Sequence, residues 1–89
     1  MEKRWVVYIL SCNDGTLYTG ITDNLSRRFA QHCAGKGAKY TRGRAPLKLV
    51  YAERCADHSD ALRREIAIKR LRRTKKQALC ANSCVESFL

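Results

Sequence analysis

The first half of the chain carries short runs of apolar residues that predict β-strands. Residues 5–10 are all β-branched, aromatic or aliphatic, which is typical of a buried strand. The turn sequence Asn13-Asp14-Gly15 follows, and residues 17–22 have the composition of a returning strand. We therefore predict an antiparallel hairpin over residues 5–22, and a third strand over residues 47–52.

The segment after the hairpin has helical periodicity. Asp23 or Asn24 can cap a helix that begins near Leu25. Leu25, Phe29 and Cys33 then recur at every fourth position and form one apolar stripe. Two glycines shortly after residue 33 end this helix.

A second helical pattern follows the third strand. It begins at a capping residue, Ser59 or Asp60, and runs to about Arg73, and a shorter helix spans residues 75–80. Two strands, a helix, a strand and further helices predict an α/β fold. We expect a single-domain, three-stranded, mostly antiparallel sheet flanked by about three helices.

Glu65 stands out on the second helix. At about 100° per residue, it falls inside the apolar arc formed by Ala61, Leu62, Ile66, Ile68 and Leu71. A carboxylate turned towards the body of a domain is costly unless something pairs with it. One explanation is an ion pair with Lys69, four residues later, which is the commoner case for such a residue. The other is a metal ligand.

Two further pairs of residues have chemical potential. Arg28 and His32 lie four residues apart on one line of the first helix, where an arginine fork suits phosphate oxygens and a histidine can move a proton. If the hairpin turn centres on Asp14, residues 8 and 20 lie opposite each other, and Tyr18 lies one diagonal step from Tyr8 on the same face. Two phenols there could position or deprotonate a water. The alternatives are solvated residues on a helix edge and ordinary packing tyrosines.

Charge is the unusual feature of the composition. Eighteen Lys and Arg stand against eight Asp and Glu, a formal net charge of +10. Such an excess favours a polyanionic partner, above all a nucleic acid; an acidic protein or an anionic membrane surface is the alternative. The glycine-containing loop over residues 35–46 and the second helix with its exit concentrate the cations. We predict nucleic-acid contacts at Lys36, Lys39, Tyr40, Thr41, Arg42, Arg44, Lys69, Arg72 and Arg73.

Length and cysteine content exclude several classes of protein. At 89 residues the chain has room for one core, so we assign residues 1–80 to a single domain and residues 81–89 to a short tail. Five cysteines without C-x-x-C spacing argue against a disulfide framework and a zinc site. The apolar run near the N-terminus is too short for a signal-peptide core or a membrane span, so we expect a cytoplasmic protein without membrane contact.

Five short motifs, in order, resemble the GIY-YIG nucleases, especially their small stand-alone members of the UPF0213-like group. The resemblance covers about residues 5–76. The motifs are Val7-Tyr8-Ile9, Tyr18-Thr19-Gly20, the L-x-x-R-x-x-x-H helix from Leu25 to His32, the string Gly37-Ala38-Lys39-Tyr40-Thr41-Arg42 followed by Pro46 and Leu49-Val50-Tyr51, and Ala61-Leu62-Arg63-Arg64-Glu65.

The resemblance implies a role for each matched residue. Glu65 would hold one divalent cation, Mg²⁺ or Mn²⁺, against the scissile phosphate, and Arg28 would stabilise the charge of the transition state. Tyr8 or Tyr18 would orient or deprotonate the attacking water, and His32 would assist that transfer or contact the phosphate.

The resemblance therefore implies a metal-dependent endonuclease acting on DNA. By analogy, its preferred substrate class is branched or damaged DNA in repair or recombination, with a protein partner supplying part of its specificity. The alternatives are a non-catalytic or weakly catalytic module that binds DNA or RNA on the same scaffold, and a protein adaptor that uses the basic face.

Overall fold

The computed structural model describes residues 4–83 and 85. Its strands and α-helices follow one another in the predicted order, and a 3₁₀ turn lies in the segment that was predicted as a loop. The elements are β1 (Val6–Ser11), β2 (Leu17–Thr22), α1 (Leu25–Cys33), the 3₁₀ turn η1 (Lys39–Thr41), β3 (Lys48–Arg54), α2 (His58–Lys69) and α3 (Arg73–Ala81).

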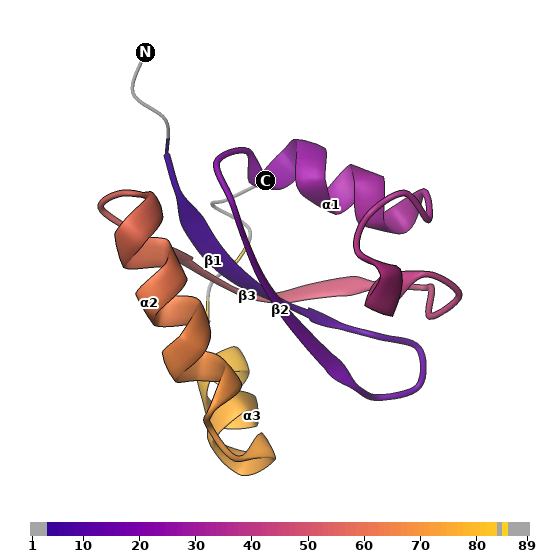
Figure 1. The fold of residues 1–89 in the computed structure, drawn as a ribbon. Coiled ribbons are helices and arrows are strands. Elements are labelled where there is room, and N and C mark those ends of the chain that lie inside the picture. The colour runs from indigo at the N-terminus through magenta and orange to yellow at the C-terminus, as the bar shows by residue number, and fades with distance from the viewer. Residues whose placement is uncertain (1–3, 84, 86–89) are drawn as a thin grey trace.

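The three strands form one antiparallel sheet in the order β2-β1-β3. Tyr8 pairs with Gly20 across β1 and β2, which confirms the predicted hairpin register. Helix α1 covers one face of the sheet, and α2 and α3 cover the other (Figure 1). The predicted α/β fold with a three-stranded antiparallel sheet and three helices is thus confirmed.

The central strand β1 is buried on both faces of the sheet. Val6, Tyr8 and Leu10 point to the cluster that includes Leu25 of α1. Val7 and Ile9 point to the opposite cluster with Ile68 of α2. A strand covered on both sides loses the polar alternation of a surface strand, and this explains its continuous apolar run.

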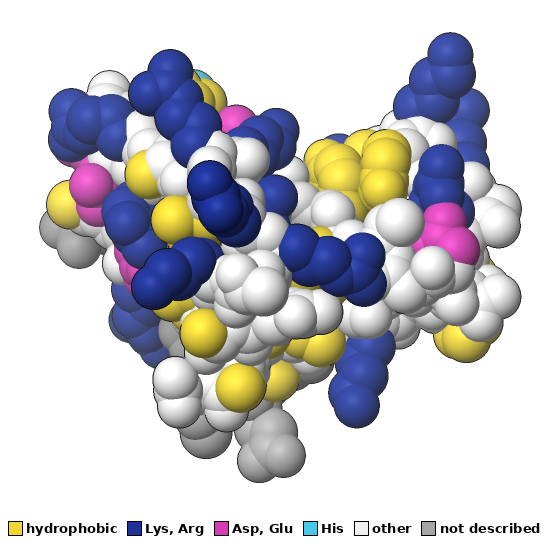
Figure 2. Space-filling model, turned by 90° about the horizontal axis from the view of Figure 1, so that it is seen from below, with side chains coloured by type: hydrophobic (Ala, Val, Ile, Leu, Met, Phe, Trp, Pro, Cys, Tyr) yellow, Lys and Arg dark blue, Asp and Glu magenta, His cyan; other side chains and the backbone are white. Residues whose placement is uncertain are grey.

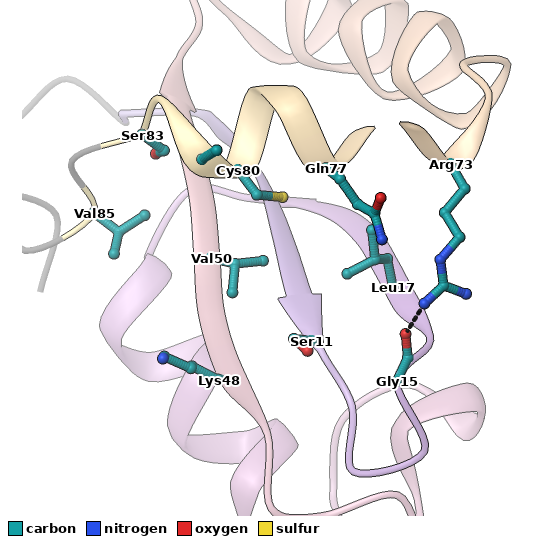
Figure 3. Close-up of a pocket in the computed structure, with 11 residues that line it drawn as sticks. Ser11, Gly15, Leu17, Lys48, Val50, Arg73, Gln77, Cys80, Ser83 and Val85 are labelled. Atoms are coloured by element: carbon teal, nitrogen blue, oxygen red, sulfur yellow. Dashed lines mark hydrogen bonds between the residues drawn. The ribbon is translucent and has the colours of Figure 1, made fainter. Parts of the chain in front are cut away.

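The hairpin loop is held from two directions. Asp14 forms an ion pair with Arg44 of the loop that precedes β3. Arg73, at the start of α3, donates a hydrogen bond of 2.7 Å to the Gly15 carbonyl (Figure 3). Gly15 has a φ of +82°, a conformation that glycine adopts without strain. The hairpin tip is therefore fixed relative to both flanking segments.

The predicted cap of α2 was wrong. Asp57, rather than Ser59 or Asp60, is the N-cap, and its side chain accepts a hydrogen bond from the Asp60 amide. The Asp60 carboxylate reaches back to accept from the Ala56 amide at 2.9 Å. This reciprocal arrangement satisfies two amides, and it places the N-cap two residues before Ser59 and three before Asp60.

The predicted boundary between the last two helices was also wrong. Helix α2 ends at Lys69, with Arg70 as its C-cap, instead of continuing to about Arg73. Helix α3 then begins at Arg73 and not at residue 75. The break between them allows α3 to fold back under the sheet (Figure 1).

The apolar stripes of the helices are narrower than predicted. On α2, Ile68 is 1% exposed, whereas Ile66 is 49% exposed and Leu62 is also on the surface. On α1, Cys33 is exposed and the neighbouring His32 is buried instead. Each helix touches the sheet along a single line, so residues at the edge of the apolar arc remain outside the core.

The proposed tail falls largely outside the described residues. Within residues 81–89, Ala81 is the last residue of α3, and Val85 packs against the cluster on the α1 face of the sheet. Cys84 and residues 86–89 lie outside the described part of the chain. The division at residue 80 stays a prediction.

Two substitutions on α2 test this packing. Ile68→Ala is expected to lower the free energy of unfolding by about 2–5 kcal/mol, because it leaves a cavity between α2 and the sheet. The matched change Ile66→Ala should alter it by no more than about 0.5 kcal/mol, since that side chain is half exposed. Urea denaturation measures both, and equal losses at the two positions would contradict the observed rotation of α2.

Candidate active site

Tyr8 lies across the backbone of the neighbouring strand at Gly20. A Cβ atom at residue 20 would come within 2.7 Å of the Tyr8 hydroxyl oxygen and 2.8 Å of its Cζ atom. Only glycine leaves room for the ring in this position. Tyr18, on β2, lies beside it with ring centroids 6.4 Å apart. The two phenols predicted to converge on one face of the hairpin do so.

His32 connects the sheet to the loop after α1. Its side chain is 1% exposed, and its Nε2 lies 2.8 Å from the Tyr8 hydroxyl oxygen. Its Nδ1 lies 2.8 Å from the hydroxyl oxygen of Thr41. Burial, and then the positive charge of Arg28, lower the pKa of His32 below its usual value. Because both ring nitrogens are occupied inside the protein, the structure argues against the expected alternative in which His32 contacts a phosphate.

The loop after α1 closes tightly over His32. A Cβ at residue 37 would lie 2.3 Å from His32 Nδ1, so Gly37 allows the close approach. Thr41 of η1 is 2% exposed and also donates to the Ala38 carbonyl at 2.9 Å. The expectation that Thr41 contacts nucleic acid assumed an exposed hydroxyl, and the structure corrects it.

The contacts of Thr41 and Gly37 with His32 were not predicted from the sequence. Both belong to the string that carries part of the family resemblance, and this was the available signal.

Arg28 interacts with both tyrosines. The pKa of Tyr8 is raised to about 12, chiefly by burial, and the Arg28 guanidinium opposes this rise. Burial also raises the pKa of Tyr18, and Arg28 lowers that pKa as well. The guanidinium is half-buried and its Nη1 donates to the Gln31 side chain at 3.3 Å. It therefore lies beside the phenols with part of its surface open to a ligand.

Glu65, on α2, interacts electrostatically with the same two tyrosines. Its side chain is 19% exposed, and its carboxylate raises the pKa of both Tyr8 and Tyr18. The preceding residue, Arg64, donates to Glu53 of β3 at 2.7 Å, which fixes the rotation of α2. Helix α2 packs against the edge strand β2, so its carboxylate can face the phenols beyond that edge.

Both explanations offered for Glu65 have a basis in the structure. Its Oε2 atom lies 3.7 Å from Lys69 Nζ, the ion pair expected at this spacing. The same carboxylate is close enough to the two tyrosines to act on their pKa. The structure thus brings together the five side chains proposed from sequence, namely those of Tyr8, Tyr18, Arg28, His32 and Glu65.

The donor atoms suit a loosely held hard cation. Among the described residues, no three His, Cys, Asp or Glu side chains gather into a metal-binding group. Glu65 offers one carboxylate beside an open approach. Mg²⁺ commonly binds through one or two carboxylates, several waters and a substrate phosphate. The residues therefore fit a cation that binds together with a phosphate.

Basic side chains are numerous on the surface of the molecule. Figure 2 shows Lys and Arg side chains spread over the lower face of the molecule, with few acidic ones between them. Tyr40 is exposed, its ring stacks on Tyr18 with centroids 5.9 Å apart, and Arg44 lies 4.4 Å from its centroid. The other proposed contacts, at Lys36, Lys39, Arg42, Lys69, Arg72 and Arg73, are exposed.

The hollow between α3 and the sheet (Figure 3) is a separate feature, because its lining includes none of the five site residues.

The chain resembles known proteins over most of its length. Residues 4–78 match the GIY-YIG catalytic domain. A UPF0213 protein of Desulfotalea psychrophila is 57% identical over 88% of this chain and 72% of its own length. One from Natronomonas pharaonis is 58% identical over 92% of this chain and 96% of its own length.

Solved structures agree. The solution NMR structure of a UPF0213 protein from Bacillus halodurans is 46% identical, with a TM-score of 0.57, over 88% of this chain and 83% of that one. A solution NMR structure of an E. faecalis protein is 37% identical, with a TM-score of 0.61, over 90% of this chain and 86% of that one. Within the described residues, no helix has the length and apolar character needed to cross a bilayer.

GIY-YIG domains form a nuclease superfamily whose members generally use divalent metal ions and act on nucleic acids. Fold, sequence and the grouping of side chains agree, and the chain belongs to the GIY-YIG family as a small UPF0213-type member.

Proposed function

We propose that this protein is a divalent-metal-dependent endonuclease that hydrolyses phosphodiester bonds of DNA. The observation that carries the proposal is that Tyr8, Tyr18 and His32 pack together, while Arg28 and Glu65 both act electrostatically on the two phenols. The cationic Arg28 can bind a phosphate, and the anionic Glu65 can bind a metal ion. The two tyrosine hydroxyl groups can orient a water. The net charge of +10 supports a polyanionic substrate.

The proposed roles follow from chemistry and position. Arg28 donates to the scissile phosphate and stabilises the negative charge that grows on it in the transition state. One of the two phenols orients the attacking water or takes its proton, and buried His32 assists that transfer. Glu65 holds the cation, Mg²⁺ or Mn²⁺. A cation bound there would polarise the phosphate and stabilise the leaving oxygen.

We propose branched or damaged DNA, as formed in repair or recombination, as the preferred substrate. The exposed cations, from Lys36 to Arg73, can recognise phosphates, and phosphate contacts position a protein without reading sequence. Selectivity would then come from the shape of the DNA or from a protein partner that delivers the enzyme.

A second candidate function is a non-catalytic or weakly catalytic module that binds DNA or RNA. The contact between Glu65 and Lys69 favours it, because the ammonium group competes with a metal ion for the same carboxylate. In that case binding would persist without cleavage.

A nicking assay with Mg²⁺ on duplex and branched DNA separates the two functions. Glu65→Gln and Arg28→Ala are each expected to slow cleavage by about 100-fold or more, because each removes charge stabilisation at the reacting phosphate. Arg27→Ala is the matched control, since it removes an exposed cation from the same turn of α1 and should slow cleavage less than about tenfold.

Cleavage that persists in both Glu65→Gln and Arg28→Ala would contradict the site. Tight binding by the unaltered protein, with no cutting of any substrate, would establish the binding module instead.

The affinity for DNA should fall steeply as the salt concentration rises. Replacing Lys36 or Arg42 by Gln should each reduce the slope of log affinity against log salt by about one, if each contacts one phosphate. Arg63→Gln is the control, because residue 63 lies about 200° around α2 from Glu65. Fluorescence anisotropy measures the slopes, and an equal effect of all three changes would contradict the proposed binding face.

A further inference from the structure

A small hollow beside the candidate site is lined by an aromatic ring, two cations and a hydroxyl group. Its lining residues are Thr16, Leu17, Tyr40, Arg73 and Lys76, and we call it the Tyr40 hollow. Its volume is about 190 Å³. Small-molecule pockets usually exceed about 300 Å³, so this hollow suits one small flat group rather than a whole cofactor.

The Tyr40 ring connects this hollow with the paired phenols. It stacks on the Tyr18 ring with centroids 5.9 Å apart, and the Tyr18 centroid in turn lies 6.4 Å from that of Tyr8. Tyr40 is still 41% exposed, so part of its aromatic surface remains open to a ligand. A group that packs on that surface would therefore lie next to whatever the phenols hold.

Tyr40 is held in place although it is exposed. The Arg44 guanidinium lies 4.4 Å from the ring centroid, and its Nε donates to the Tyr40 carbonyl at 2.7 Å. Arg44 is itself paired with Asp14 of the hairpin loop. A ring that is already fixed loses little conformational entropy when a ligand covers it, so Tyr40 can serve as a stacking platform.

The two cations of the hollow belong to α3. Arg73 is exposed and donates to the Gly15 carbonyl (Figure 3), and an arginine has further N–H groups that can bind a phosphate. Lys76 is half-buried and lies three residues further along the helix. Residues three apart are neighbours on a helix surface, so both cations can contact one phosphate.

We propose that the Tyr40 hollow is a subsite for one unpaired base of a DNA strand, whose adjoining phosphate binds Arg73 and Lys76. The inference rests on the proposed action on DNA and narrows its substrate class. An aromatic platform beside phosphate-binding cations suits single-stranded nucleic acid, because any base can stack while the charges follow the backbone. Neither contact reads the identity of the base.

The subsite gives the selection of branched or damaged DNA a physical cause. A paired base can reach the Tyr40 ring only after it leaves its helix, which costs the stacking and pairing energy of that base. A base that is already unpaired, next to the scissile phosphate, avoids this cost. Such DNA is therefore favoured at one exposed ring, without a contact specific to sequence.

The first test places a fluorescent base in the hollow. The probe is a short duplex with a single-stranded flap of thymidines, in which 2-aminopurine replaces one unpaired base at a time. EDTA is present, so that metal-dependent cleavage does not occur. Stacking on Tyr40 should quench the fluorescence at an unpaired position near the junction by about twofold or more. Tyr40→Phe should keep the quenching, and Tyr40→Ala should abolish it.

The second test measures affinity by fluorescence anisotropy in the same buffer. Tyr40→Ala should weaken binding to the flap DNA by about tenfold, the usual contribution of one stacked base. Its affinity for a fully paired duplex should change by less than about twofold, which also shows that the variant is folded. Equal losses on the two DNAs would overturn the stacking role.

A third measurement tests the phosphate contact. Lys76→Gln should reduce the slope of log affinity against log salt by about 0.7 on the flap DNA, the contribution of one phosphate in a single strand. Lys75→Gln is the matched control, because it removes the same charge from the neighbouring position of α3, which does not line the hollow. An equal effect of the two changes would overturn the assignment of the phosphate to Lys76.

The outcomes separate the subsite from the nuclease. Quenching that is unaltered in Tyr40→Ala would overturn the subsite, whatever the nicking assay shows. Quenching that depends on Tyr40, in a protein that cuts no DNA, would overturn the hydrolytic function and support the subsite as part of a binding module.

Discussion

The arrangement of the site depends on one buried chain of hydrogen bonds, from Tyr8 through His32 to Thr41 and the Ala38 carbonyl. These groups come from β1, α1 and the loop at η1. A buried polar group without a partner costs stability, so the three segments are held where each group is satisfied. Within the described residues every buried side-chain nitrogen and oxygen has a partner. The polar centre thus joins α1 and its following loop to the sheet.

Around that centre the charges are arranged unequally. Glu65 is a carboxylate in a chain of net charge +10. Glu65 and Arg28 shift the pKa of the same two phenols in opposite directions. Lys69 partly neutralises the Glu65 carboxylate in the free protein. A divalent cation arriving with a phosphate would replace that weak contact, and a half-exposed ion pair of this kind contributes little to stability. The weak ion pair with Lys69 thus holds Glu65 in place and still leaves its carboxylate able to bind a metal ion.

Sequence patterns predicted the elements that depend on local periodicity. The strand β2 and the start of α1 at Leu25 were placed correctly, because alternation and a capping asparagine are local signals. The opposition of Tyr8 and Gly20 followed from the turn at Asp14. Ordered motifs also identified the family. The start of α2 was predicted wrongly because its cap depends on which of several neighbouring acids reaches an amide, as Asp57 does here.

The sequence by itself determined the fold class, the hairpin register, the family and the set of five candidate residues. Only the tertiary structure decided that His32 is buried while Cys33 is exposed, that Ile66 lies outside the core, and that Thr41 faces a histidine rather than a ligand. The physical reason is that helical periodicity defines a face but not the line along which the helix meets its neighbour. Contacts between distant segments, such as a glycine that lets a loop close on a ring, leave no periodic trace in the sequence.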